Sequence, residues 1–145
     1  MNSAAQFTLR IYIMKLIIIL LLSLVINSNV FSKEAAKSAC LKFFKHIDAK
    51  KYKKTWDNSA LYFQNAIKKD QWNKSLEAVR TPLGKNRSRK MLSETPKSSL
   101  AGAPDGNYII YQYQSSFENK KHAVETITFT ESKDKKWKLV GYFIK

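Results

Sequence analysis

The sequence contains few of the residues that form disulfide cross-links, metal sites and glycine-rich catalytic loops. Its 145 residues include one cysteine, two histidines and four glycines. A single cysteine excludes an intramolecular disulfide, so packing alone must stabilise the fold. His46 and His122 do not form a ligand cluster, and we expect both on the surface. The glycines are too scattered for a phosphate loop or a nucleophile elbow. We therefore expect neither a metal nor a cofactor.

Acidic residues and arginines are also scarce, which limits what the positive charge can mean. Lysines and arginines number 26 against 11 acidic residues, for a net charge of +15, and only four are arginines. Recognition of bases and phosphates in nucleic acids relies on arginine, so we expect no nucleic-acid partner. The charge predicts a solvated, lysine-rich surface. Attraction to an anionic envelope surface, such as lipid head groups, is the alternative.

The sequence has one strongly apolar run, and it lies near the N-terminus. After Lys15, residues 16–26 form an almost wholly apolar segment of 11 residues. This is shorter than the roughly 20 residues of a membrane span and typical of a signal peptide, with Val30 and Ser32 at the cleavage site. We predict that residues 1–32 are a signal peptide, with Met14 as a second candidate start. The protein is then periplasmic or secreted, and an uncleaved membrane anchor is the alternative.

The predicted mature chain, residues 33–145, has the size of one domain. Its 113 residues suffice for a single hydrophobic core, and no membrane span is expected in this form. Cys40 lies at helical spacing with Phe43, Phe44 and Ile47, which predicts a buried, inert thiol. An intermolecular disulfide is the alternative.

The apolar pattern of the mature chain changes from helical spacing to strand alternation. Helices are predicted over residues 33–50, 51–68 and about 70–80, with a bend near Asn58, a cap at Asp70 and a stop at Pro82. Strands are predicted over residues 86–93, 107–117, 122–131 and 136–144, with a loop over residues 94–106 and short polar hairpin turns. Helices followed by antiparallel strands predict an α+β fold with helices packed on one face of a curved sheet.

One carboxylate falls on the apolar face of a predicted strand. Alternation places Glu125 between Ala123 and Ile127, where it needs a partner. Arg80 and Arg89 are candidate partners because a guanidinium can bind a carboxylate with two hydrogen bonds. Three interpretations remain open: a structural ion pair, the polar floor of a ligand pocket, and a catalytic acid or base.

Aromatic residues are concentrated on the predicted strands. Four tyrosines lie there, namely Tyr108, Tyr111, Tyr113 and Tyr142. They line a cleft in one interpretation and cover a half-buried sheet in the other. Trp137, Leu139 and Phe143 are the core candidates of the last strand.

Six short motifs follow one another along the mature chain. They are Arg80-Thr81-Pro82-Leu83-Gly84, Ser88-Arg89, Pro104-Asp105-Gly106-Asn107-Tyr108, Phe117-Glu118-Asn119-Lys120, Glu125-Thr126-Ile127-Thr128 and the C-terminal segment from Trp137 to Lys145. With the helix that carries Tyr52 and Trp56, they resemble a bacterial family of small exported proteins described as domain of unknown function four thousand and nineteen. The resemblance covers about residues 35–145. It implies an exported α+β domain without an established activity, and it brings no catalytic residues. The order of elements is also similar to the cone-shaped nuclear-transport-factor-2-like fold.

Together, these features favour an exported, non-enzymatic domain that binds a small molecule or an envelope protein on a concave sheet face. The predicted polar centre is Glu125, Arg80 and Arg89, and the predicted walls are Tyr111, Tyr113 and Tyr142. One alternative is a small hydrolase or isomerase with Glu125 as acid or base. Another is an envelope-associated structural protein that acts through its lysine-rich surface.

Overall fold

The computed structural model of the protein describes residues 3–145, without the side chains of residues 3–6, 8, 9, 11 and 19–31. Contacts divide the chain into two units, Met1–Glu34 and Ala35–Lys145. The first helix, α1 (Ser3–Asp48), continues from one unit into the other. Much of the predicted signal-peptide core, and Val30 of its cleavage site, lie outside the described side chains. Among the described residues, no helix combines the length and apolar character that a membrane span requires.

The first unit is helical and exposes apolar side chains. The large apolar side chains described between Phe7 and Ile18 are all about half exposed or more. The part of this unit with described side chains therefore contributes none of the buried residues of the core, which begins at Ala36.

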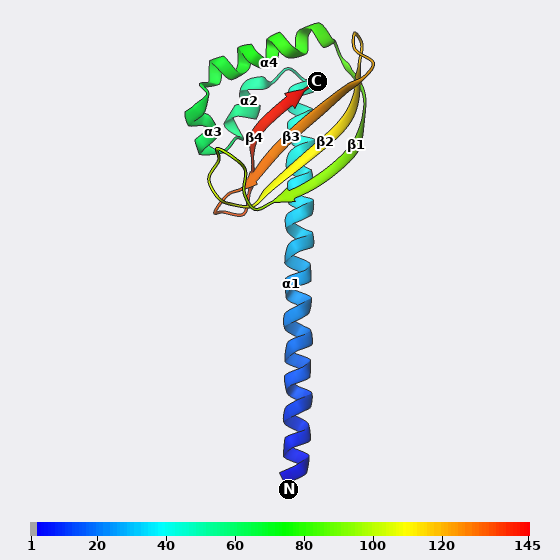
Figure 1. Ribbon diagram of the computed structural model, residues 1–145, viewed down its shortest axis with the longest axis vertical. Helices are drawn as coiled ribbons and strands as arrows, with labels where there is room; N and C mark the ends of the chain where they lie inside the picture. Colours follow the sequence, from blue (N-terminus) through cyan, green and yellow to red (C-terminus); the bar gives the residue numbers. More distant parts are fainter. Residues whose placement is uncertain (1–2) are drawn as a thin grey trace. The chain divides into compact units, whose positions relative to one another are not determined.

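The second unit is an α+β domain in which short helices precede an antiparallel sheet. After α1 come α2 (Tyr52–Asp57), α3 (Leu61–Ala66) and α4 (Lys69–Leu83). The strands are β1 (Asn86–Lys97), β2 (Tyr108–Phe117), β3 (Ala123–Glu131) and β4 (Trp137–Ile144), which pair in the order β1-β2-β3-β4 (Figure 1). The predicted fold class is confirmed: helices come first, and a four-stranded antiparallel sheet follows.

The end of α1 and the break after α2 show how local sequence sets these helices. The amide of Lys51 donates to the carbonyl of His46 at 2.8 Å, and Lys50 has a φ of 56°. This is a Schellman-type stop, in which one residue adopts the left-handed conformation. The predicted bend near Asn58 is a complete break, because Ala60 and Asn58 exchange backbone hydrogen bonds with Leu139 of β4.

Helix α4 differs from its prediction at both ends. Its N-cap is Lys68, so the predicted cap at Asp70 is wrong, and Asp70 instead lies in the first turn. A carboxylate there still interacts favourably with the helix dipole. The helix runs beyond Arg80 and includes Pro82, then ends where Gly84 adopts a φ of 73°. A left-handed glycine, rather than the proline, therefore stops this helix.

Strand β1 is longer than predicted. It continues from the expected end at residue 93 to Lys97 and includes Pro96, which pairs with Ile109. Because β1 is at the edge of the sheet, its open side needs no ladder donors, and an edge strand tolerates proline. The other strands begin and end within one residue of their predicted bounds.

The core lies between the helices, chiefly α1 and α4, and one face of the sheet. In Figure 1 the C-terminal part of α1 passes behind the strands. The apolar side chains of this part of α1 belong to the same buried cluster as those of β2, β3 and β4. Cys40 is fully buried, as predicted, and burial raises the pKa of its thiol to about 12. The core members are Ala36, Cys40, Phe43, Phe44, Ile47, Tyr52, Trp72, Leu76, Ile109, Tyr111, Tyr113, Ile127, Phe129 and Leu139.

A β-bulge in β4 changes which face of the sheet its last residues point to. Thr128 pairs with Gly141 and Phe129 with Leu139, so Val140 is an extra residue. Leu139 is buried as predicted, and Trp137 packs partly buried against the core. The prediction for Phe143 is wrong, since this side chain is 56% exposed. Strict alternation from Leu139 had placed Phe143 inside; the extra residue moves it out.

We predict that Gly84→Ala destabilises the domain by about 2 kcal/mol or more, because the backbone conformation is unfavourable for other residues and the added methyl has no room. A Cβ at position 84 would lie 2.7 Å from Oε2 and 2.8 Å from Cβ of Glu118. Chemical denaturation measures the difference. Gly141→Ala is the matched control, since nothing lies within 4 Å of its Cβ position. Equal stability of the two variants would contradict this account.

Candidate functional site

Glu125 of β3 is fully buried and is the centre of a dense set of hydrogen bonds. Its Oε1 accepts from Nη1 of Arg80 at 3.1 Å, from Nη2 of Arg89 at 3.2 Å and from the hydroxyl of Tyr142 at 2.6 Å. Its Oε2 accepts from Nε of Arg89 at 2.6 Å and from the hydroxyl of Ser115. Both carboxylate oxygens are thus occupied by donors from three strands and α4.

A second carboxylate, at the end of α1, binds the same two arginines. Oδ1 of Asp48 accepts from Nη2 of Arg80 at 2.7 Å and from Nη2 of Arg89 at 2.8 Å. Oδ2 of Asp48 accepts from Nη1 of Arg89. Two positive and two negative side chains therefore form one closed set, which we call the charge network: Asp48, Arg80, Arg89 and Glu125.

Aromatic rings cover the two arginines of this network. The guanidinium of Arg80 lies 4.6 Å from the ring centre of Phe117, and that of Arg89 lies 4.0 Å from that of Phe44. These are cation–π distances, so the rings partly replace the lost hydration. Burial disfavours the charge of Arg89, but its hydrogen bonds to Asp48 and Glu125 outweigh this and raise its pKa above the usual value. Arg89 therefore remains charged.

Strand register and helical spacing bring these side chains together. Arg80 follows Trp72 and Leu76 at intervals of four residues on the buried side of α4. Arg89 of β1 lies opposite Ser115 of β2, which is a near neighbour of Glu125 on the same sheet face. The bulge in β4 turns Tyr142 inward, where burial and the charge of Glu125 raise the pKa of its hydroxyl.

The structure joins the predicted polar centre to one predicted wall, Tyr142, and packs the other two, Tyr111 and Tyr113, into the hydrophobic core. Ion pairs join Glu125 to Arg80 and to Arg89, which confirms the expected partners. Tyr142 belongs to the same hydrogen-bonded set, whereas Tyr111 lies in the hydrophobic core. Tyr113 packs there too: its hydroxyl is 3.8 Å from Sγ of Cys40.

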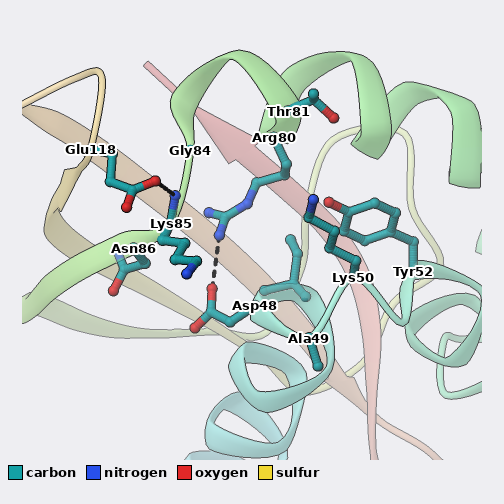
Figure 2. A pocket seen from close by; sticks show the side chains of 11 residues that line it. Asp48, Ala49, Lys50, Tyr52, Arg80, Thr81, Gly84, Lys85, Asn86 and Glu118 are labelled. Carbon is teal, nitrogen blue, oxygen red and sulfur yellow. Dashed lines mark hydrogen bonds and ion pairs between the residues drawn. The ribbon is translucent and has the colours of Figure 1, made fainter.

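An open pocket adjoins the charge network on the side of Asp48 and Arg80 (Figure 2). Its volume is about 560 Å³, and it lies between the end of α1, the end of α4, the start of β1 and the β2–β3 turn. Of the six predicted site residues only Arg80 lines it. The lining residues are Ile47, Asp48, Ala49, Lys50, Tyr52, Arg80, Thr81, Gly84, Lys85, Asn86 and Glu118.

Sequence reasoning missed several of these residues. Asp48 follows the buried Ile47 at the end of a helix rich in lysine. Nothing in the neighbouring sequence indicates that its carboxylate forms an ion pair with Arg89 of β1. Ser115 shares the inward face with Tyr111 and Tyr113, and alternation in β2 could have indicated it. The pocket residues Lys50 and Lys85 lie in connections between elements and follow no periodic pattern.

The fold and the site define an α+β domain with a charge network centred on a buried carboxylate and an open pocket beside it. The chain belongs to the family described as Protein of unknown function (DUF4019), whose model matches residues 39–142. The match includes every member of the charge network and all four strands except the last residues of β4. Comparison with curated proteins finds no match.

We predict that Glu125→Gln lowers the free energy of unfolding by about 3–5 kcal/mol, because it removes one charge from a buried set and leaves the arginines under-compensated. Thermal or urea denaturation measures this loss. Asp57→Asn is the control, since its ion pair with Lys69 is about half exposed and is expected to contribute at most about 1 kcal/mol. A Glu125→Gln variant as stable as Asp57→Asn would show that the network does not support the fold.

Proposed function

We propose that this protein is an exported, non-enzymatic binding domain whose ligand, a small molecule or a group of an envelope protein, occupies the pocket beside the charge network. The observation that carries the proposal is the position of Arg80. Its side chain is 4% exposed and fixed by Asp48 and Glu125, yet the residue lines the open pocket. A pocket wall held by ion pairs is pre-organised, which reduces the entropy lost on binding.

The geometry of Glu125 favours binding over catalysis. A general acid or base must reach the substrate within hydrogen-bonding distance. Glu125 is 0% exposed, and its two oxygens already accept five hydrogen bonds. Asp48 is more accessible, but its oxygens accept three hydrogen bonds from the two arginines. These contacts support a structural role for both carboxylates.

Export is proposed from the leader and from the way the chain divides. The compact second unit begins at Ala35, close to the predicted cleavage after Ser32, and the family match begins at residue 39. The described apolar side chains before Ile18 are exposed and contribute nothing to the core. Residues 1–32 then act as a signal peptide that directs the following domain to export.

We predict that the protein isolated after expression of the full sequence starts close to residue 33 and lies outside the cytoplasm. Intact-mass measurement on cell fractions tests this. Ile17→Lys interrupts the apolar run and should leave the leader attached and the protein inside the cell. Ser38→Lys adds the same charge to an exposed position beyond the leader and should not change processing. A processed, exported Ile17→Lys protein would contradict the signal-peptide assignment.

We predict that the protein purified from its own cell envelope carries a bound molecule in this pocket, seen by native mass spectrometry as a non-covalent mass increment. Ala49→Trp fills the pocket from an exposed position at its edge and should abolish the increment without lowering the melting temperature. Ala101→Trp, in the exposed loop before β2, is the matched control and should keep it. An increment that persists in Ala49→Trp, or none in the unaltered protein, would contradict the proposal.

A further inference from the structure

We infer that the pocket recognises an anionic group, a carboxylate or a phosphate, which binds between the ammonium groups of Lys50 and Lys85 and the free edge of Arg80. This inference rests on the proposed function and specifies the chemistry of its ligand. Figure 2 shows the side chain of Arg80 between those of Lys85 and Lys50, and all three residues line the pocket.

The acidic residues of the pocket wall are already neutralised. Asp48 is bound by Arg80 and by Arg89. Glu118 is bound by Arg87 at 2.6 Å, and its Oε2 accepts the backbone amide of Lys85 at 2.9 Å, which lowers the pKa of this carboxyl. Neither carboxylate therefore offers a free negative charge to a cationic ligand.

Among the described residues, the two lysines of the pocket are not neutralised by an acidic partner. Within the described part of the chain, the ammonium groups of Lys50 and Lys85 form no ion pair. Arg80 has five N–H donors, and its hydrogen bonds to Asp48, Glu125 and Tyr142 use three of them. Nε and one hydrogen of Nη2 remain, and the charge left uncompensated in the pocket is positive.

The backbone of Lys50 gives an independent indication. Its φ of 56° lies in the left-handed region, at the helix-stop position where glycine is most common. A lysine there is less favourable for stability than a glycine, and such strain is concentrated at functional sites. The position places a lysine side chain in the pocket wall at a cost to the backbone.

A second lysine provides a matched control for this strain. Lys135, in the β3–β4 turn, has a φ of 60° and does not line the pocket. Lys50→Gly and Lys135→Gly remove the same charge and relieve the same backbone conformation, so both should raise the melting temperature. Lys50→Gly alone should weaken anion binding.

The test is a titration of the protein, purified after expression of its full sequence. Sodium phosphate, sodium acetate or sodium chloride is added at equal ionic strength, and binding is monitored through the amide chemical shifts. We expect saturable shifts around Lys50, Arg80 and Lys85 with phosphate or acetate. Lys50→Gly and, as a second variant, Lys85→Gln should each weaken the affinity about tenfold, the effect of one charged hydrogen bond. Lys135→Gly should bind as the unaltered protein does. Saturation by phosphate alone identifies a phosphate site, and saturation by both anions identifies a carboxylate-tolerant one.

Equal weakening by Lys50→Gly and Lys135→Gly, or equal effects of chloride, would show diffuse attraction to a basic protein and overturn the inference. So would the absence of saturable shifts with any of the three salts. The proposed function is decided separately by the retained mass increment. A retained cationic or neutral molecule that Ala49→Trp expels would leave the binding function standing and refute the anionic ligand.

Discussion

The interaction on which the rest of this domain depends is the buried pairing of Glu125 with two arginines. An isolated carboxylate in the interior is costly, and so is an unpaired guanidinium. Here Arg80 comes from α4, Arg89 from β1 and Asp48 from the end of α1, so one network links two helices and the edge strand to β3. Each partner satisfies the others, and the surrounding packing must hold all of them at once.

The network also explains why the pocket lies where it does. The same ion pairs that seal Glu125 inside leave one face of Arg80 and Asp48 at the wall of an open cavity. The rigid arginine is fixed by the core, while Lys50 and Lys85 come from the connections that end α1 and begin β1. An ion-paired centre with charged residues at its edge is suited to holding a ligand, which is the basis of the proposed function.

Much of the fold could be predicted because its signals are local. Helical spacing of Cys40 and Phe44 indicated the buried face of α1, and strand alternation placed Glu125 inside. The partners Arg80 and Arg89 followed from the need to neutralise a buried carboxylate. The errors occurred where one residue changes the local geometry: the bulge at Val140 moved Phe143 out, and Gly84, not Pro82, ended α4.

The sequence by itself determined the fold class, the strand order in the chain and the chemical need for a partner at Glu125, because periodicity and charge act over a few residues. The tertiary structure alone decided that Asp48 joins the network, that Tyr111 belongs to the core and that the open pocket lies next to Glu125 instead of around it. These outcomes depend on how α1 and α4 pack against β1 and β3. Contacts between residues so far apart in the chain leave no periodic signal in a single sequence.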